Sequence, residues 1–133
     1  MTTFDPIEIT LDCEVVPYVR MTQKSKYVDD NAIRYLENKT DLKKLMSIAN
    51  HNREYYQEYY VPERCPFGAV VTFYVNKMHH CDLDNQLKAI MDAGNGILYK
   101  DDRWCDEFGK TSRVLTKGEP HVQLIIYPLE ETA

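Results

Sequence analysis

Apolar and polar residues alternate strictly near the start of the chain, between Ile7 and Val15. Because successive side chains of a strand point to opposite faces, this alternation predicts a β-strand with one face in the core and the other in water. Pro17 is expected to end the strand, since proline has no backbone N–H to donate to a neighbouring strand. The chain is therefore predicted to begin with a half-exposed strand over residues 7–15.

A helical period replaces the alternation between about residues 31 and 60. The run Asn38-Lys39-Thr40 predicts an interruption, after which Thr40 would cap a new helix beginning at Asp41. Four tyrosines near the end of this region form two pairs at helical spacing, which favours packing against a core or a subunit over stacking on exposed bases. They are Tyr55, Tyr56, Tyr59 and Tyr60, and the apolar face of the second helix consists of Leu42, Leu45, Met46 and Ala49.

The second half of the chain contains three further strands and one helix. Residues 69–75 are apolar or aromatic on both faces, which predicts a central strand buried on both sides. Residues 83–93 follow the helical period, and Gly94 or Gly96 is expected to end that helix. Two further strands are predicted at residues 104–115 and 121–127, and the Lys-Gly-Glu-Pro turn between them predicts a β-hairpin. The inward face of the helix consists of Leu83, Leu87, Ile90 and Met91.

This order of elements predicts an α+β fold, in which one mixed β-sheet is packed by helices. The 133 residues suit a single domain over residues 1–133, because a chain of this size buries roughly two-thirds of the surface exposed in its unfolded form. No apolar run approaches the roughly 20 residues that cross a bilayer, and the N-terminus lacks the basic and apolar regions of a secretory signal. We therefore expect a soluble cytoplasmic protein.

The four cysteines are dispersed, with no Cys-x-x-Cys pair and no matching histidine pair of the kind that marks a zinc site. They are expected to be reduced thiols, and the disulfides of an exported protein are the alternative. The cysteines are Cys13, Cys65, Cys81 and Cys105.

The formal net charge of −5 and the pI near 5.3 argue against a protein that binds nucleic acid over a broad basic surface. Any DNA contact must therefore be local. The best basic cluster is Arg20, Lys24 and Lys26, in a loop where charges alternate with hydroxyl and aromatic side chains that suit phosphate and sugar. An ordinary solvated loop is the alternative interpretation of the same residues.

The residues with the clearest chemistry surround the helix predicted at 83–93. In extended backbone, Asp82 and Asp84 would point to the same side and could grip one cation, and Asp84 is predicted to be the helix N-cap. Lys88 lies one turn further on the same face, where an ammonium would stabilise a phosphate oxygen. Together with Asp101 and Asp102, these side chains can hold a hard divalent cation against a phosphate. We interpret the chain as a metal-dependent DNA nuclease.

A surface salt-bridge stripe is the alternative for Asp84, Lys88 and Asp92, worth about 0.3–0.5 kcal/mol per pair. That interpretation leaves Asp82 and the pair Asp101-Asp102 unexplained, because neighbouring like charges repel unless a cation joins them.

A calcium loop of the EF-hand type is excluded. In a loop that begins at Asp82, the required glycine and glutamate positions hold Leu87 and Ala93. His79 and His80 adjoin the carboxylates, but adjacent strand residues point in opposite directions, so at most one would assist a metal or phosphate. A plain surface role is the alternative for both histidines.

The sequence of residues 82–93, the Asn-Gly-Ile-Leu that follows at 95–98 and the pair Asp101-Asp102 resemble the signature of RusA-type Holliday junction resolvases. These crossover junction endodeoxyribonucleases are found widely in phages and prophages. The loop from Pro17 to Lys26 also resembles the N-terminal basic region of that family. An Asp-x-Asp-Asn-x-x-Lys core with a downstream Asp-Asp is a fairly specific combination.

The resemblance implies that Asp82, Asp84 and Asp102 bind Mg²⁺, with Mn²⁺ as a substitute, and that Asp101 is auxiliary. It implies that Lys88 is the essential base-like or phosphate-contacting residue. It also implies a RusA-like homodimer that resolves four-way junctions by paired symmetric nicks, in DNA recombination and repair in a bacterial or phage-infected cell. The chain departs from the family pattern in its acidic charge and in its long helical region.

Three other functions are left open. A nuclease for flaps or replication forks would have the same motifs. A non-catalytic phage DNA-binding protein would keep its function after Asp82→Asn. A metal-binding structural module would have a lower melting temperature when its metal is chelated, and would not act on DNA.

Overall fold

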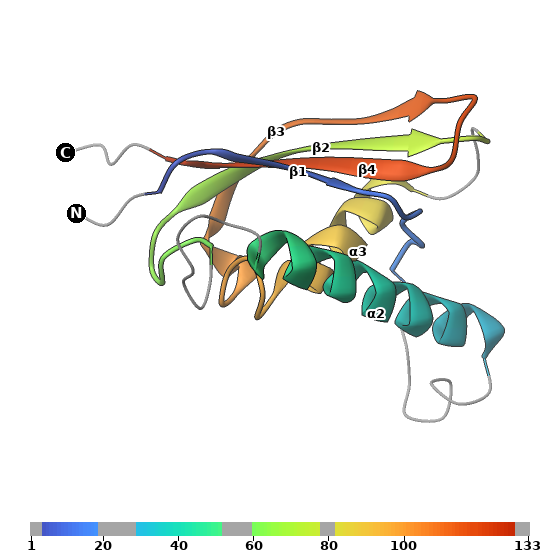
Figure 1. Cartoon of the computed structure of the whole chain (residues 1–133), viewed down its shortest axis with the longest axis horizontal. Helices are drawn as coiled ribbons and strands as arrows, with labels where there is room; N and C mark the ends of the chain where they lie inside the picture. The colour runs from blue at the N-terminus through green and yellow to red at the C-terminus, as the bar shows by residue number, and fades with distance from the viewer. Residues whose placement is uncertain (1–3, 19–28, 52–59, 78–81, 130–133) are drawn as a thin grey trace.

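The computed structural model describes residues 4–18, 29–51, 60–77 and 82–129. In these residues four strands form one mixed sheet in the order β1-β4-β2-β3, and both helices lie on the same face of it (Figure 1). The predicted α+β fold is confirmed. The strands are β1 (Ile7–Leu11), β2 (Phe67–Val75), β3 (Cys105–Leu115) and β4 (His121–Pro128), and the helices are α2 (Asp30–His51), α3 (Leu83–Gly94) and the short 3-10 helix η1 (Asp102–Trp104).

The core lies between the sheet and the two helices. Alternate residues of β2 and β4 point to the helices and are buried, which is the period of two expected of strands with one covered face. α3 runs across this face, and its C-terminal end packs near Tyr99, a fully buried residue whose ring stacks on Phe67 with centroids 4.9 Å apart. The Tyr99 hydroxyl donates to the Met91 carbonyl over 2.7 Å, so its polar atom is satisfied in the core. The helix predicted at 83–93 is confirmed.

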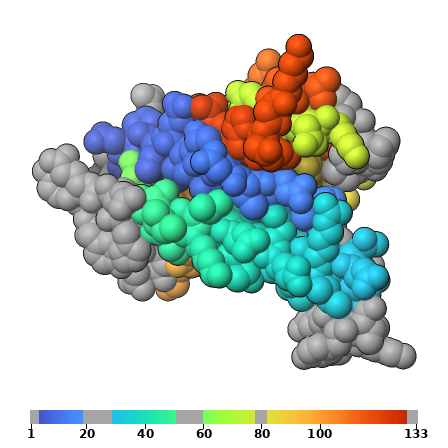
Figure 2. All heavy atoms as spheres, turned by 45° about the vertical axis from the view of Figure 1, so that its right-hand side comes forward, coloured from blue at the N-terminus to red at the C-terminus, as the bar shows by residue number. Residues whose placement is uncertain are grey.

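β1 ends at Leu11, four residues earlier than predicted. The backbone bends at Asp12 and Cys13, and the adjacent residues Val15 and Val16 are both buried, which strand alternation does not allow. This segment leaves the sheet because side chains of the helices, rather than a neighbouring strand, satisfy its backbone. In Figure 2 the blue N-terminal residues lie directly against α2, which is coloured green to cyan.

α2 is continuous from Asp30 to His51, so the predicted interruption at Asn38-Lys39-Thr40 is wrong. The Thr40 hydroxyl donates to the carbonyl of Leu36, one turn earlier, over 3.1 Å. A hydroxyl satisfied in this way remains inside a helix and caps nothing. Asn38 is 8% exposed and makes tertiary contacts that offset its weak helical preference.

Two further strand predictions need correction. β2 is buried on one face only: Val70, Thr72 and Tyr74 are half-buried on the face that no helix covers. The predicted hairpin is wrong as well, because β2 lies between β3 and β4, parallel to the first and antiparallel to the second. The connection from β3 to β4 passes the end of β2, where the Thr116 N–H donates to the Val75 carbonyl over 2.8 Å.

The expected thiols and the expected packing of Tyr60 agree with the structure. Cys13, Cys65 and Cys105 are free, while Cys81 lies outside the described residues. Tyr60 packs edge-on against Phe4, and the other three tyrosines of its group lie outside the described residues. None of the described helices is long and apolar enough to cross a membrane.

Candidate functional site

Asp82 and Asp84 lie at the N-terminal end of α3. Asp82, rather than Asp84, is the N-cap: its carbonyl accepts the Asn85 N–H over 3.1 Å, and its side chain makes no capping hydrogen bond. The prediction that both carboxylates extend from a strand is therefore wrong, because Asp84 is already inside the helix. Both side chains are exposed, and neither has a hydrogen-bond or ion-pair partner among the described residues. Negative charge at this position interacts favourably with the N-terminal end of the helix dipole.

Lys88 lies one helical turn after Asp84, and an aromatic ring holds its side chain. Its Nζ is 3.9 Å from the centre of the Tyr18 ring. Tyr35 in turn meets the Tyr18 ring edge-on, with centroids 5.6 Å apart and an angle of 84°. A cation over an aromatic face is attracted by about 0.5–2 kcal/mol. The exposed ammonium thus has a preferred position beside the acidic end of α3.

Tyr18 owes its place to buried amides that hold residues 14–18, which we call the clasped segment. Asn38 of α2 accepts the Val16 N–H and donates to the Glu14 carbonyl, both over 2.8 Å. Gln86 of α3 donates to the Val15 carbonyl over 3.0 Å, and Tyr18 itself donates its N–H to the Asn85 carbonyl over 3.0 Å. Gln86 is fixed on its other side by Arg113 of β3, which donates twice to its Oε1. The two helices and β3 therefore fix the position of the clasped segment, which leads into the basic loop.

A second acidic pair lies at the other end of α3. The Asp102 side chain contacts that of Asp92; burial first, and then the neighbouring Asp92 carboxylate, raise the pKa of Asp102, while a hydrogen bond with Asn95 opposes the rise. The Asn95 side chain also accepts the Asp102 N–H over 2.7 Å. Asp101 caps the short helix η1 by accepting the Arg103 N–H, which fixes the turn before Asp102.

The two acidic pairs do not meet within the described chain. Asp84 and Asp92 are eight residues apart on α3, or about 12 Å along the axis at 1.5 Å per residue. Among the described residues, no three carboxylate, histidine or cysteine side chains are close enough together to hold one metal ion. The structure therefore groups Asp82 with Asp84, and Asp92 with Asp102, and does not unite the three predicted ligands Asp82, Asp84 and Asp102.

The donor set nevertheless fits a hard divalent cation. All four groups are carboxylates, the ligands that Mg²⁺ prefers. Asp92 and Asp102 place two anions in contact, an arrangement that a cation would relieve. The ammonium of Lys43 is bound to the carbonyls of Ala93 and Asn95, over 3.1 and 3.0 Å, at the C-terminal end of α3.

Replacing Asp102 by asparagine should stabilise the metal-free protein at pH 7. A carboxyl whose pKa is raised by folding stabilises the fold below its unfolded pKa, and this contribution is lost as the pH rises through the folded pKa. Ionised Asp102 thus opposes folding at pH 7, and the gain in melting temperature for Asp102→Asn should shrink as the pH is lowered toward the ordinary value of 3.8. Calorimetry between pH 4 and 7 measures this, with the exposed Asp106→Asn on β3 as control; a lower melting temperature for Asp102→Asn at pH 7 would contradict it.

Several sequence predictions fall outside the described residues. Arg20, Lys24 and Lys26 of the basic loop do so, as do His79 and His80. The structure also adds two groups that the sequence interpretation missed. Asp92 had been considered only as part of a surface stripe, and nothing in the sequence linked Tyr18 to Lys88, 70 positions later.

The comparison with known protein families agrees with this chemistry, although the comparison with curated proteins finds no match. The family model described as Endodeoxyribonuclease RusA matches residues 3–127, a range that contains the described helices and strands except for Pro128, the last residue of β4. An exposed acidic helix end beside a held lysine is thus found in a sequence that matches a DNA-cleaving family over nearly its whole length. The chain belongs to the RusA endodeoxyribonuclease family, whose members are Holliday junction resolvases that hydrolyse DNA phosphodiester bonds.

Proposed function

We propose that this protein acts as a Mg²⁺-dependent homodimer that resolves four-way DNA junctions by paired symmetric nicks. The observation that carries the proposal is the pair of exposed carboxylates of Asp82 and Asp84, which have no partner in the part of the chain that the structure describes; Asp84 lies one helical turn from the ammonium of Lys88. Unpartnered anions at this position are open to a cation, and the cation would allow an acidic surface to accept a polyanion. Membership of the RusA family indicates that the substrate is DNA and that the reaction is hydrolysis of a phosphodiester bond.

Each site residue has a distinct role in this proposal. Asp82, Asp84 and Asp102 would hold the metal, which when bound activates a water molecule and offsets charge on the phosphate. Lys88 binds a non-bridging phosphate oxygen, and Tyr18 restricts where its ammonium can lie. Asp101 orders the turn that presents Asp102. Arg20, Lys24 and Lys26 follow directly on Tyr18 and would contact the DNA backbone.

The separation of the two acidic pairs gives the homodimer a part in catalysis. One chain supplies Asp82 and Asp84 at one end of α3 and, at the other end, Asp102 in contact with Asp92, which is about 12 Å from Asp84 along the helix axis. A two-fold dimer repeats both pairs, so Asp82 and Asp84 of one protomer and Asp102 of its partner can serve one ion. Two such sites would match the approximate two-fold symmetry of a four-way junction.

Replacing Tyr18 by leucine should slow cleavage by about 5- to 30-fold, the equivalent of a lost cation–π contact. Tyr18→Phe keeps the aromatic face and should stay within about twofold of the wild-type rate. Single-turnover cleavage of a junction measures both variants, at matched melting temperature. Equal rates for Tyr18→Leu and Tyr18→Phe would show that the ring does not act on Lys88.

The direct test incubates the purified protein with a labelled four-way junction and with a linear duplex of the same sequence, with and without Mg²⁺. Metal-dependent, symmetric nicking of the junction alone is expected. Cleavage of flaps or forks in preference to the junction would replace the proposed substrate by another branched DNA. No cleavage of any of these DNAs with Mg²⁺ or Mn²⁺ would refute the proposal.

A further inference from the structure

The hydroxyl of Tyr35 is buried and has no hydrogen-bond partner among the described residues. Tyr35 belongs to α2 and is 2% exposed. Tyr99, the other deeply buried tyrosine of the described chain, donates its hydroxyl to the Met91 carbonyl. Buried hydroxyl groups are usually hydrogen-bonded in this way, because an unbonded one is unfavourable for folding. The function proposed so far gives the Tyr35 hydroxyl no role.

Contacts on both sides of Tyr35 hold α2 against α3. The Tyr35 ring meets the Tyr18 ring edge-on, with centroids 5.6 Å apart, and Tyr18 covers the ammonium of Lys88 on α3. About two turns further along α2, Lys43 donates to the carbonyl of Ala93 near the end of α3. Tyr35 therefore lies beside the part of α3 that runs from Lys88 to Ala93.

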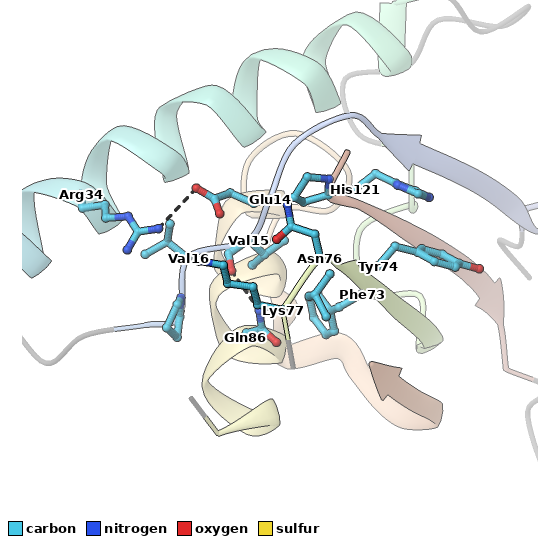
Figure 3. A pocket seen from close by; sticks show the side chains of 13 residues that line it. Glu14, Val15, Val16, Arg34, Phe73, Tyr74, Asn76, Lys77, Gln86 and His121 are labelled. Carbon is cyan, nitrogen blue, oxygen red and sulfur yellow. Dashed lines mark hydrogen bonds and ion pairs between the residues drawn. The ribbon is translucent and has the colours of Figure 1, made fainter. Parts of the chain in front are cut away.

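The clasped segment also holds this part of α2. Arg34, the residue before Tyr35, forms an ion pair with Glu14 over 3.4 Å, drawn as a dashed line in Figure 3. Asn38, about one turn after Tyr35, accepts the Val16 N–H over 2.8 Å. The buried ring between these contacts is closely packed and cannot turn freely. An acceptor for its hydroxyl must therefore come to it.

Asp92 of α3 is an acid close to Tyr35. Burial first, and then the charge of Asp92, raise the pKa of Tyr35 to about 12. The Asp92 side chain also contacts that of Asp102, one of the proposed metal ligands. A carboxylate has about four acceptor positions, so Asp92 can stay beside Asp102 and still accept a hydrogen bond from elsewhere. Asp92 thus connects the buried hydroxyl with the proposed metal site.

The lysines on this side of α3 are held by other groups. Lys88, one helical turn before Asp92, has its ammonium over the Tyr18 ring. Lys43 donates to two carbonyls at the end of α3. Within the described part of the chain, neither lysine forms an ion pair with Asp92. The Tyr35 hydroxyl is therefore a donor that remains available to this carboxylate.

We propose that Tyr35 is a positioning residue of the metal site: its hydroxyl donates to the carboxylate of Asp92, and Asp92 held in this way joins Asp102 in binding the cation. The half-buried Asp92 side chain can turn toward the packed ring. Metal-binding carboxylates are commonly held by such outer hydrogen bonds, whose loss weakens metal binding or activity by about 10- to 100-fold. This inference rests on the proposed function, because it assumes a cation at Asp102.

Tyr35→Phe removes only the hydroxyl and should weaken metal binding without weakening the fold. Its melting temperature without divalent metal should equal or exceed that of wild type, since no hydrogen bond among the described residues is lost. Calorimetric titration with Mn²⁺, without DNA, should show an affinity about tenfold lower. The Mg²⁺ concentration for half-maximal cleavage should rise equally, whereas the single-turnover rate at saturating Mg²⁺ should stay within about threefold of wild type.

Tyr99→Phe is the control, because it removes a buried tyrosine hydroxyl that the fold uses. It should lower the melting temperature by a few degrees and leave the Mn²⁺ affinity within about twofold of wild type. A melting temperature for Tyr35→Phe as low as that of Tyr99→Phe would show that the Tyr35 hydroxyl already has a structural partner, such as a buried water molecule, and would overturn the proposal.

A double variant tests whether Tyr35 acts through Asp92. Asp92→Ala should itself weaken Mn²⁺ binding, and adding Tyr35→Phe to it should weaken binding no further. Losses that add in the double variant would show that Tyr35 acts on another group, and would also overturn the proposal.

Metal titration and cleavage separate this inference from the proposed function. A Mn²⁺ affinity that depends on Tyr35, without cleavage of any junction, would keep the role of Tyr35 and refute the nuclease. Mg²⁺-dependent cleavage of the junction, with metal affinity and Mg²⁺ requirement unchanged in Tyr35→Phe, would keep the nuclease and refute the role of Tyr35.

Discussion

Asp82→Asn should lower the rate of junction cleavage by at least about 100-fold, the equivalent of several kcal/mol of lost metal-assisted stabilisation. Binding of the junction should be kept or strengthened, because the change removes a negative charge that repels DNA phosphate. Asparagine has almost the same shape, and the Asp82 side chain makes no capping hydrogen bond, so the fold has little to lose. Single-turnover cleavage in Mg²⁺ and a binding assay without metal measure the two effects.

The matched control for this variant is Asp106→Asn, which removes an exposed carboxylate of β3. It should cleave as the wild type does. If Asp82→Asn keeps its melting temperature and cleaves within a few-fold of wild type, Asp82 does not bind the metal. If Asp82→Asn abolishes cleavage but still supports the biological function in a cell that needs the protein, the interpretation as a non-catalytic DNA-binding protein gains support.

A heterodimer of two inactive chains should recover cleavage if the metal site is shared between protomers. Asp82→Asn and Asp102→Asn would each be inactive as homodimers. In a heterodimer of the two, both substitutions fall in one shared site, and the other site keeps Asp82 and Asp102 intact. Heterodimers isolated through two different affinity tags should therefore nick one strand of the junction at about half the wild-type rate, without the paired second nick.

The matched control is a heterodimer of Asp82→Asn with Asp84→Asn. These residues share one end of α3, so each site of that heterodimer lacks one ligand and should stay inactive. Inactivity of the Asp82→Asn and Asp102→Asn heterodimer as well would place each metal site within a single chain. If both heterodimers were equally active, neither a metal site shared between protomers nor a metal site within a single chain would explain the result.

The sequence predicted the elements that depend on the local spacing of apolar and polar residues. α3 follows from its helical period, because its apolar positions recur at the spacing of one helix face, and Ile90 and Met91, expected to face inward, are buried. The strand order does not follow in this way: the short connection between β3 and β4 indicates a turn, but not that β2 lies between them. The ends of β1 and the continuity of α2 were missed for one reason, because Asn38 bonds a segment more than 20 positions earlier in the chain.

The residues of the candidate site also fall into two groups: those that local spacing predicted, and those that meet only through packing of distant segments. Asp84 and Lys88 are four residues apart, so helical spacing placed them on one face of α3, whereas the position of the N-cap and the extended backbone expected for both carboxylates were wrong. Asp92 and Asp102 meet because the chain turns after α3, where Asn95 holds the Asp102 N–H. The contact of Tyr18 with Lys88 depends on packing between distant segments, which neither propensity nor periodicity encodes.

The buried amides of Asn38 and Gln86 also determine how the protein comes apart. Asn38 belongs to α2 and Gln86 to α3, and the side chain of each bonds the clasped segment, so we expect the segment to stay in place while the two helices remain packed. The amide protons of Val16 and Tyr18 are therefore expected to exchange with solvent only when the whole domain opens, although they lie outside any strand or helix. Lys88 would then keep its contact with the Tyr18 ring during smaller local openings, and would lose this contact only when the whole domain unfolds.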